Sequence, residues 1–192
     1  MIARDLSVPH ISSGDIFREN IRAKTALGEQ VEKYVTHGKL VPDDLAVDTI
    51  LHRLAERDCG RGFVLDGFPR TLAQAELLAR RVKIDRVIQI VSSPETVVAR
   101  LGGRYTCRNC GAIHNTRWED VSKCRECSGQ LYQREDDHEA AIRRRLEQYY
   151  AEFAPILAFY TARRVQIVTV ASELAESPED IYEKYKLQRE RL

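Results

Sequence analysis

The sequence predicts an α/β protein, with crossover helices covering a parallel sheet in three layers. Four short β-rich runs carry this prediction, and each is bounded by polar or turn residues: residues 8–12, 62–68, 86–91 and 165–170. Helix-like stretches separate these runs, and such alternation is typical of parallel strands joined by helices. A chain of 192 residues, 43% hydrophobic and 31% charged, fits one compact domain with one insertion.

The expected helices follow one another along the chain. They cover residues 14–38, 42–58, 71–81, 93–101 and 139–164. Two helix starts are marked by an N-cap serine, a proline in the first turn and an early acid, at Ser93-Pro94-Glu95 and at Ser177-Pro178-Glu179. We therefore expect a further helix to begin after Ser177.

The insertion lies between Arg104 and Asp137, where the alternation of strands and helices is interrupted. It holds two Cys-x-x-Cys pairs, which are Cys107, Cys110, Cys124 and Cys127. Two such turns can place four thiolates around one zinc ion, and a closed shell of four sulfurs predicts a structural rather than a catalytic metal. The alternative is two disulfides in a secreted fold. No cationic and apolar leader and no transmembrane run supports it, so we expect a cytoplasmic protein with reduced cysteines.

The charge balance argues against a general polyanion-binding surface, because 30 basic residues face 29 acidic ones. We therefore expect neither a nucleic acid nor a membrane as partner. A zinc-ribbon module stays open as an alternative. It would bind RNA or protein through basic and aromatic side chains of the insertion, which are Arg108, His114, Arg117 and Trp118.

Two loops leave the carboxyl ends of predicted strands, where open α/β sheets bind ligands. One is SSGD after Ile11, and the other is DGFPR after Leu65. In the second, a flexible glycine and the planar fork of Arg70 suit an anion, although such a loop can also be only a turn. The three arginines at 143–145 point about 100° apart on a helix, so a solvated basic face is the alternative to a ligand site there.

Taken together, several segments carry a family resemblance in their order along the chain. They are HISSGDIFR, GKLVPDD, GFVLDGFPRTLAQAE, the four-cysteine insertion, YQREDD and RRRLEQYYAEFAPIL. Over about residues 8–160 the chain resembles the adenylate kinases with a zinc-bearing lid. The resemblance implies reversible phosphoryl transfer, ATP + AMP = 2 ADP, by a monomer that uses magnesium with ATP and carries a structural zinc. It implies an α/β core resembling the P-loop NTPases (residues 1–102 and 138–192), an AMP-binding flap (12–41) and a zinc-binding lid (103–137).

The resemblance also implies a role for each matching residue. The AMP site would comprise Ser13, Arg18, Lys39, Leu40, Val41, Gly67, Phe68, Pro69, Arg70, Gln74, Arg134 and Arg145. The catalytic set around the transferred phosphoryl group would comprise Asp66, Arg70, Arg100, Arg104, Arg134 and Arg145. Asp66 would orient magnesium, and the ATP site would include Arg104, Ile113 and His114. Such a crowd of cations suits phosphoryl transfer, which depends on positioning and on neutralising charge.

The resemblance fails at the start of the chain. The family begins with a strand and a loop of the form G-x-x-x-x-G-K-[ST], and this sequence contains no such loop. We therefore expect the first, central strand to be missing, the fold to be weak, and phosphoryl transfer to be weak or absent. Residues 62–68 and 86–91 would then pair with each other, recruit another chain or leave the domain partly molten. Two explanations remain open: an internal methionine taken as the start of the enzyme, or an AMP-binding pseudokinase.

Overall fold

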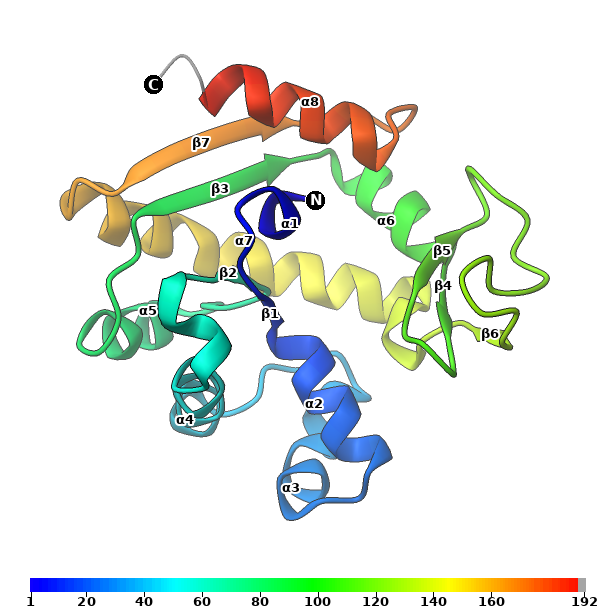
Figure 1. Cartoon of the computed structure of the whole chain (residues 1–192), viewed down its shortest axis with the longest axis horizontal. Helices are drawn as coiled ribbons and strands as arrows, with labels where there is room; N and C mark the ends of the chain where they lie inside the picture. The colour runs from blue at the N-terminus through cyan, green and yellow to red at the C-terminus, as the bar shows by residue number, and fades with distance from the viewer. Residues whose placement is uncertain (190–192) are drawn as a thin grey trace. The chain divides into compact units, whose positions relative to one another are not determined.

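The computed structural model describes residues 1–189 and has the alternation of strands and helices that the sequence predicts (Figure 1). The strands are β1 (His10–Ser12), β2 (Val64–Asp66), β3 (Arg86–Val91), β4 (Arg104–Cys107), β5 (Ile113–Asn115), β6 (Leu131–Tyr132) and β7 (Gln166–Ala171). The α-helices are α1 (Ile2–Asp5), α2 (Ser13–Arg22), α3 (Ala26–Val35), α4 (Asp43–Leu54), α5 (Leu72–Ala79), α6 (Pro94–Gly102), α7 (Glu139–Ala162) and α8 (Pro178–Arg189). Short 3-10 turns cover Arg57–Arg61 and Glu135–Asp137.

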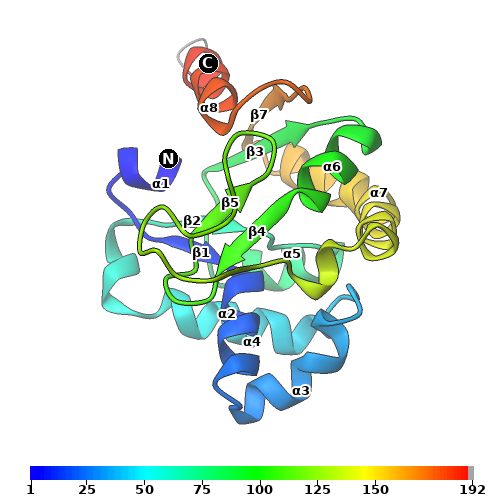
Figure 2. The same ribbon diagram turned by 90° about the vertical axis from the view of Figure 1, so that its right-hand side faces the viewer.

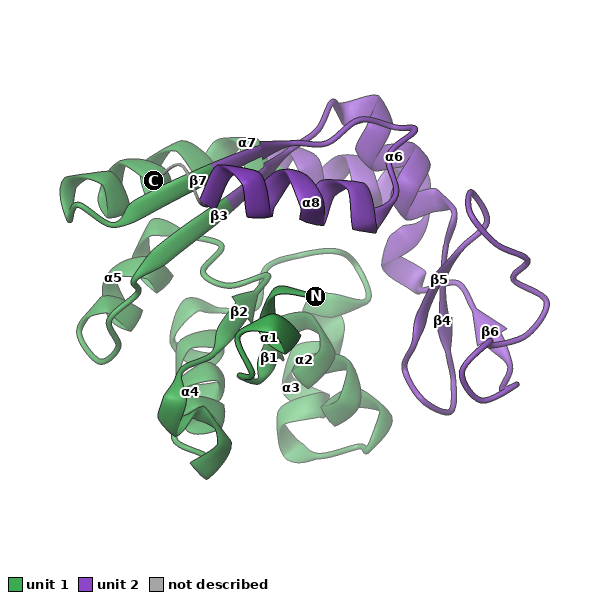
Figure 3. Ribbon diagram, turned by 45° about the horizontal axis from the view of Figure 1, so that its top comes forward, with its two compact units in different colours: residues 1–88, 148–168 green, residues 89–147, 169–192 purple. Residues whose placement is uncertain are grey.

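The chain forms two compact units, which Figure 3 colours separately. The first comprises residues 1–88 and 148–168, and the second comprises residues 89–147 together with the described part of 169–192. Helix α7 begins in the second unit and ends in the first, and strands β3 and β7 also pass from one unit to the other.

In the first unit, β1 and β2 form a parallel pair, as the sequence predicts. Ile11 lies opposite Leu65 and Ser12 lies opposite Asp66. Because the two strands run the same way and end in register, the loops that follow them leave the same edge of the sheet. The SSGD and DGFPR segments are thereby brought side by side.

Strands β3 and β7 form a second two-stranded sheet. Gln166 Oε1 accepts a hydrogen bond from Arg86 Nε at 2.7 Å, and Thr169 Oγ1 donates one to Gln89 Oε1 at 3.2 Å. Among the described residues, β2 and β3 lie in separate sheets, so their direct pairing, one expected outcome, does not occur. The prediction of parallel strands is confirmed for β1 and β2. Among the described residues, however, β1, β2, β3 and β7 form two separate pairs and not the one sheet that the sequence predicts.

The long helix expected over residues 14–38 is in fact two helices, α2 and α3. The break falls at Lys24, which has a left-handed backbone with φ of 53°. Thr25 then starts α3 by accepting a hydrogen bond from the Gly28 amide at 3.1 Å. A Cβ added at Gly28 would lie 2.2 Å from the carbonyl oxygen of Asn20, so only glycine lets the two helices pack this closely.

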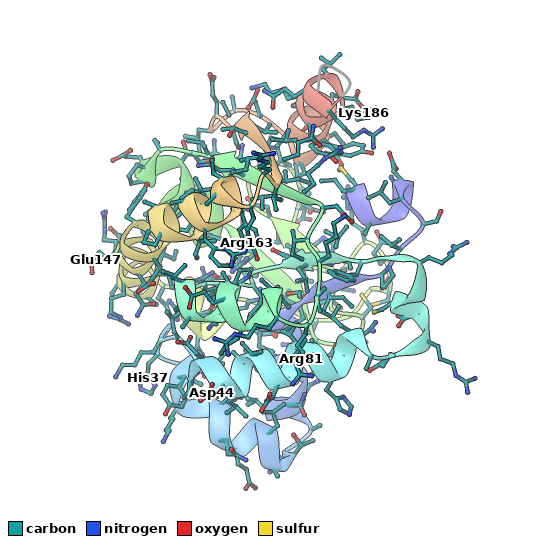
Figure 4. The ribbon with its side chains drawn as sticks, turned by 90° about the vertical axis from the view of Figure 1, so that its left-hand side faces the viewer. His37, Asp44, Arg81, Glu147, Arg163 and Lys186 are labelled. Carbon is teal, nitrogen blue, oxygen red and sulfur yellow. The ribbon has the colours of Figure 1, made fainter. Side chains whose placement is uncertain are left out.

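The first unit has two apolar cores. The larger one contains Ile11, Phe17, Val31, Ile50 and Leu78, from β1 and helices α2 to α5. The smaller one joins Ala75 of α5 to Ile156, Phe159 and Tyr160 near the end of α7. On its surface Arg163, labelled in Figure 4, lies over the Phe159 ring, 3.6 Å from the centroid. None of the described helices combines the length and apolar character that a membrane span requires.

The second unit contains a three-stranded antiparallel sheet in the order β5-β4-β6, of which Figure 2 labels β4 and β5. Tyr105 lies opposite His114, and Cys107 lies opposite Leu131. Both predicted helix starts are confirmed here. Ser93 Oγ accepts a hydrogen bond from the Thr96 amide at 3.1 Å, and Ser177 Oγ accepts one from the Asp180 amide at 3.2 Å.

Candidate active site and metal centre

The DGFPR turn is built around Gly67, whose φ of 69° favours glycine. The Gly67 carbonyl oxygen accepts hydrogen bonds from Ser13 Oγ at 2.8 Å and from Arg70 Nε at 2.7 Å. The serine that follows β1 is thus tied to the loop that follows β2. Arg70 is exposed, and its guanidinium folds back along the turn. This hydrogen bond holds the guanidinium close to the turn, within reach of an anion that binds there.

Gln74, in the first turn of α5, is only 2% exposed. Its Oε1 accepts a hydrogen bond from the Arg70 amide at 2.8 Å, and its Nε2 donates one to Asp43 Oδ1 at 2.8 Å. Thr71 Oγ1 donates to the same carboxylate oxygen at 2.9 Å. The orientation of the Gln74 amide is therefore fixed. Asp43 was not among the predicted site residues, although it lies in the GKLVPDD segment.

The other residues predicted for this site in the first unit differ in accessibility. Asp66 is exposed, and its Oδ2 lies 3.2 Å from His10 Nε2. Arg18 Nη2 donates to Asp15 Oδ1 at 2.6 Å. Lys39 is exposed and Leu40 is half-buried, whereas Val41 and Phe68 belong to the larger core. The Phe68–Pro69 peptide bond is cis.

In the second unit, two predicted arginines share the carboxylate of Asp137, whose side chain is fully buried. Arg104 binds it with two parallel hydrogen bonds, from Nε at 2.8 Å and from Nη2 at 2.5 Å. Arg145 Nη1 lies 3.5 Å from Asp137 Oδ1 and 3.1 Å from Asp136 Oδ2. A buried carboxylate with two guanidinium partners holds both cations in place.

Arg134 and Arg100 are the other two predicted arginines of this unit. Arg134 is 6% exposed and donates from Nε to Thr106 Oγ1 at 2.9 Å. Arg100 Nη2 donates to the carbonyl oxygens of Glu173 and Glu176, the latter at 2.8 Å. Burial lowers the pKa of Arg100 from its usual value. Its guanidinium lies 5.6 Å from the centre of the Trp118 ring.

The four cysteines of the insertion converge at one point. Their sulfur atoms all lie within 4.8 Å of one another, with 3.5 Å between Cys107 and Cys127 and 3.6 Å between Cys110 and Cys124. Four thiolates at about 2.3 Å from a tetrahedral zinc are separated by about 3.8 Å, so this donor set fits that ion. All four thiols are free. The backbone is shaped to suit them, since a Cβ added at Gly129 would lie 2.9 Å from the Cys107 sulfur.

Hydrogen bonding favours the thiolate at two of these cysteines. The Cys110 amide beside the Cys107 sulfur lowers the pKa of that thiol. Burial alone would raise the pKa of Cys124, but the Cys127 amide and the His114 ring together lower it to about 6. At the other two, backbone amides also act to lower the pKa, but hydrogen bonds with the neighbouring thiols outweigh them and raise the pKa of Cys110, and raise that of Cys127 to about 12. A metal binds the deprotonated sulfur, so Cys107 and Cys124 are the two thiols whose lowered pKa suits a cation.

His114 lies against the cysteine cluster and is only 3% exposed. Its Nε2 is 3.3 Å from the Cys124 sulfur and its Nδ1 is 3.0 Å from Glu119 Oε2. Its neighbour Ile113, also predicted to contact ATP, is 57% exposed. Successive residues of a strand point to opposite faces of the sheet, which separates these two side chains. Glu119 was not among the predicted site residues.

The family model described as "Adenylate kinase" matches residues 1–165 of the chain. Several proteins named adenylate kinase are similar over most of their length. The one from Caldicellulosiruptor bescii is 40% identical over 189 residues, which is 94% of this chain and 88% of that protein. The one from Methanocella arvoryzae is 43% identical over 86% of this chain and 81% of its own length. The one from Bacillus licheniformis is 43% identical over 83% and 77%.

Proposed function

The chain belongs to the adenylate kinase family of phosphotransferases, and on that premise we propose that it catalyses reversible phosphoryl transfer between ATP and AMP. The observation that carries the proposal is the pair of guanidinium groups, Arg104 and Arg145, which a single buried carboxylate holds together. Phosphoryl transfer depends on positioned cations that neutralise charge on the equatorial oxygens. Cations that are fixed in advance need little reorganisation during the reaction.

We assign AMP to the turn at Gly67 and its neighbours. Arg70 and Arg18 would bind its phosphate, and the buried amide of Gln74 would recognise its base. With Arg70 N and Asp43 bound, Gln74 retains one acceptor position on Oε1 and one donor hydrogen on Nε2. Adenine presents a complementary donor and acceptor on its Watson–Crick edge.

In addition to Arg104 and Arg145, we assign Arg100 and Arg134 to the transferred phosphoryl group. Asp66, at the exposed end of β2, would orient magnesium carried by ATP. Among the residues expected near the ATP adenine, the exposed Ile113 is free to pack against a ring, whereas His114 is held in the metal centre.

Residues 103–137 would act as a lid over ATP, and residues 12–41 as a flap over AMP. Zinc bound by Cys107, Cys110, Cys124 and Cys127 would supply a structural cross-link between two turns of the lid. A closed lid excludes water and so prevents hydrolysis of the nucleotide.

The test is an assay of ADP formation from ATP and AMP with Arg145→Ala and Arg143→Ala. Arg143 lies on the same helix but forms an exposed pair with Glu139, so it is a matched control. Loss of a guanidinium that stabilises the transferred group should lower kcat by about 100-fold or more in Arg145→Ala. Equal activity of the two variants would contradict the assignment. Saturable AMP binding by a wild-type chain that forms no ADP would instead identify a nucleotide-binding protein without transferase activity.

A further inference from the structure

We propose that Arg125, Glu119 and His114 form a relay that positions the Cys124 sulfur, making His114 a positioning residue of the metal centre. The inference rests on the proposed zinc site and adds to it residues outside the set of four ligands. It gives a different role to a histidine that the family resemblance placed against ATP.

The relay is continuous from the surface to the sulfur. Arg125 Nε lies 2.7 Å from Glu119 Oε2, and that oxygen lies 3.0 Å from His114 Nδ1. The opposite ring nitrogen, Nε2, lies 3.3 Å from the Cys124 sulfur. Exposure falls along the same path, from 70% for the Arg125 side chain to 11% for Glu119 and 3% for His114.

The relay is also anchored to the backbone. Glu119 Oε1 accepts a hydrogen bond from the Asn115 amide at 3.2 Å, which ties the carboxylate to the end of β5. His114 itself lies on β5, opposite Tyr105 of β4. The ring is therefore fixed by its strand and by its carboxylate before it meets the sulfur, so it can hold Cys124 in one position.

Such an arrangement suits a site of four thiolates. Their charges repel one another, and a hydrogen bond that His114 Nε2 donates to one sulfur reduces that repulsion and fixes the direction of the sulfur. Because Nδ1 donates to the Glu119 carboxylate at the same time, the ring acts as a donor at both nitrogens. Carboxylate–histidine pairs commonly orient a histidine that is itself a metal ligand. Here the pair lies one step farther from the metal. All four coordination positions are filled by sulfur, so His114 orients the Cys124 ligand and does not bind the metal itself.

Two substitutions separate the halves of the relay. An asparagine amide can mimic Nδ1 and a glutamine amide can mimic Nε2, so His114→Asn keeps the contact with Glu119 whereas His114→Gln keeps the contact with Cys124. His37→Asn is the matched control, because His37 is exposed and lies in the first unit, away from the insertion in sequence (Figure 4). Glu119→Gln is a milder variant that removes the carboxylate charge without opening the core.

The experiment loads each full-length variant with zinc and measures metal release to a chromophoric chelator. Cobalt loading then reports the thiolate-to-metal charge-transfer band. We expect His114→Asn to lose about 10- to 100-fold in metal affinity and to alter the cobalt band. We expect His114→Gln to retain most of the affinity, Glu119→Gln to fall between the two, and His37→Asn to match the wild type.

The outcomes are distinguishable. A wild-type chain that takes up neither zinc nor cobalt overturns the metal centre and the relay with it. A wild-type chain that loads normally, with His114→Asn releasing metal at the wild-type rate, overturns the relay alone. Equal losses in His114→Asn and His114→Gln also overturn it, because a general packing defect would not distinguish them. Circular dichroism checks that each variant folds. If His114→Asn does not fold, the metal affinity of Glu119→Gln provides the test, and an affinity equal to that of the wild type overturns the relay.

Discussion

Gln74 Nε2 donates a hydrogen bond to Asp43 Oδ1 at 2.8 Å, although the two residues lie 31 positions apart in the chain. The same carboxylate oxygen accepts a hydrogen bond from Thr71, and the amide oxygen of Gln74 accepts one from Arg70. Asp43 therefore fixes the orientation of the Gln74 amide, because it binds the nitrogen and leaves the oxygen facing Arg70. If Gln74 recognises adenine, Asp43 sets the pattern of donor and acceptor that the base meets.

We expect Asp43→Ala to weaken AMP binding, because a Gln74 amide that can rotate no longer presents one fixed pattern. Loss of a hydrogen bond to a charged group costs about 1.5 to 3 kcal/mol, or about tenfold or more in Kd. Titration calorimetry with AMP and GMP measures the effect, and discrimination between the two bases should also fall. Asp44→Ala is the control, since Asp44 lies next to Asp43 and is exposed (Figure 4). Equal AMP affinity in the two variants would refute the role of Asp43.

We expect Asp137→Ala to destabilise the fold strongly. Its buried carboxylate binds Arg104 through two hydrogen bonds, and its loss leaves a partly buried cation without that partner. Breaking such a pair costs about 3 to 5 kcal/mol in the free energy of unfolding. Denaturant unfolding measures the change. Glu139→Ala removes one partner of an exposed pair with Arg143 and should cost less than about 1 kcal/mol. A difference of less than about 1 kcal/mol between the two variants would show that the pair contributes little.

The cysteine cluster predicts one zinc ion per chain. Metal analysis of purified protein should find that content in the wild type and less than half of it in a Cys107→Ala, Cys124→Ala double variant. Cys59→Ser should keep its metal, because Cys59 is buried elsewhere, beside Arg53. Chelation should lower the melting temperature, since binding energy at a structural zinc site contributes to folding. Zinc-free protein with an unchanged melting temperature would count against a structural role.

We expect the contacts at the start of α8 to contribute less to stability at acid pH. The hydroxyl of Ser177, together with its amide, lowers the pKa of Asp180, and Lys184 lowers that of Glu176. A carboxyl group with a lowered pKa in the fold stabilises it above the ordinary value of about 4, and that stabilisation is lost as the pH falls through the folded pKa. The difference in melting temperature between wild type and Asp180→Asn should therefore shrink between about pH 6 and about pH 3. Glu179→Gln, changed at an exposed neighbour, controls for the charge alone. A difference that stays constant with pH would exclude this contribution.

The sequence by itself determined the features that depend on neighbours along the chain. Short β-rich runs bounded by polar or turn residues located β1, β2, β3 and β7, because a strand buried on both faces is apolar over its whole length. The Ser93 cap began α6 where predicted, since the serine bonds an amide three residues ahead. Cys-x-x-Cys spacing likewise placed each pair of sulfurs on one turn, and the two pairs meet at one point.

Only the tertiary structure decided which distant partner each polar side chain takes. Asp43 meets Gln74 because α4 packs beside α5, Arg104 meets Asp137 across 33 positions, and His114 turns toward Cys124. Residue type gives each of these groups several possible partners, and burial then penalises any that stay unpaired. The division of residues 14–38 into α2 and α3 has the same origin. The close approach of Gly28 to the end of α2 is a packing contact that helical periodicity does not record.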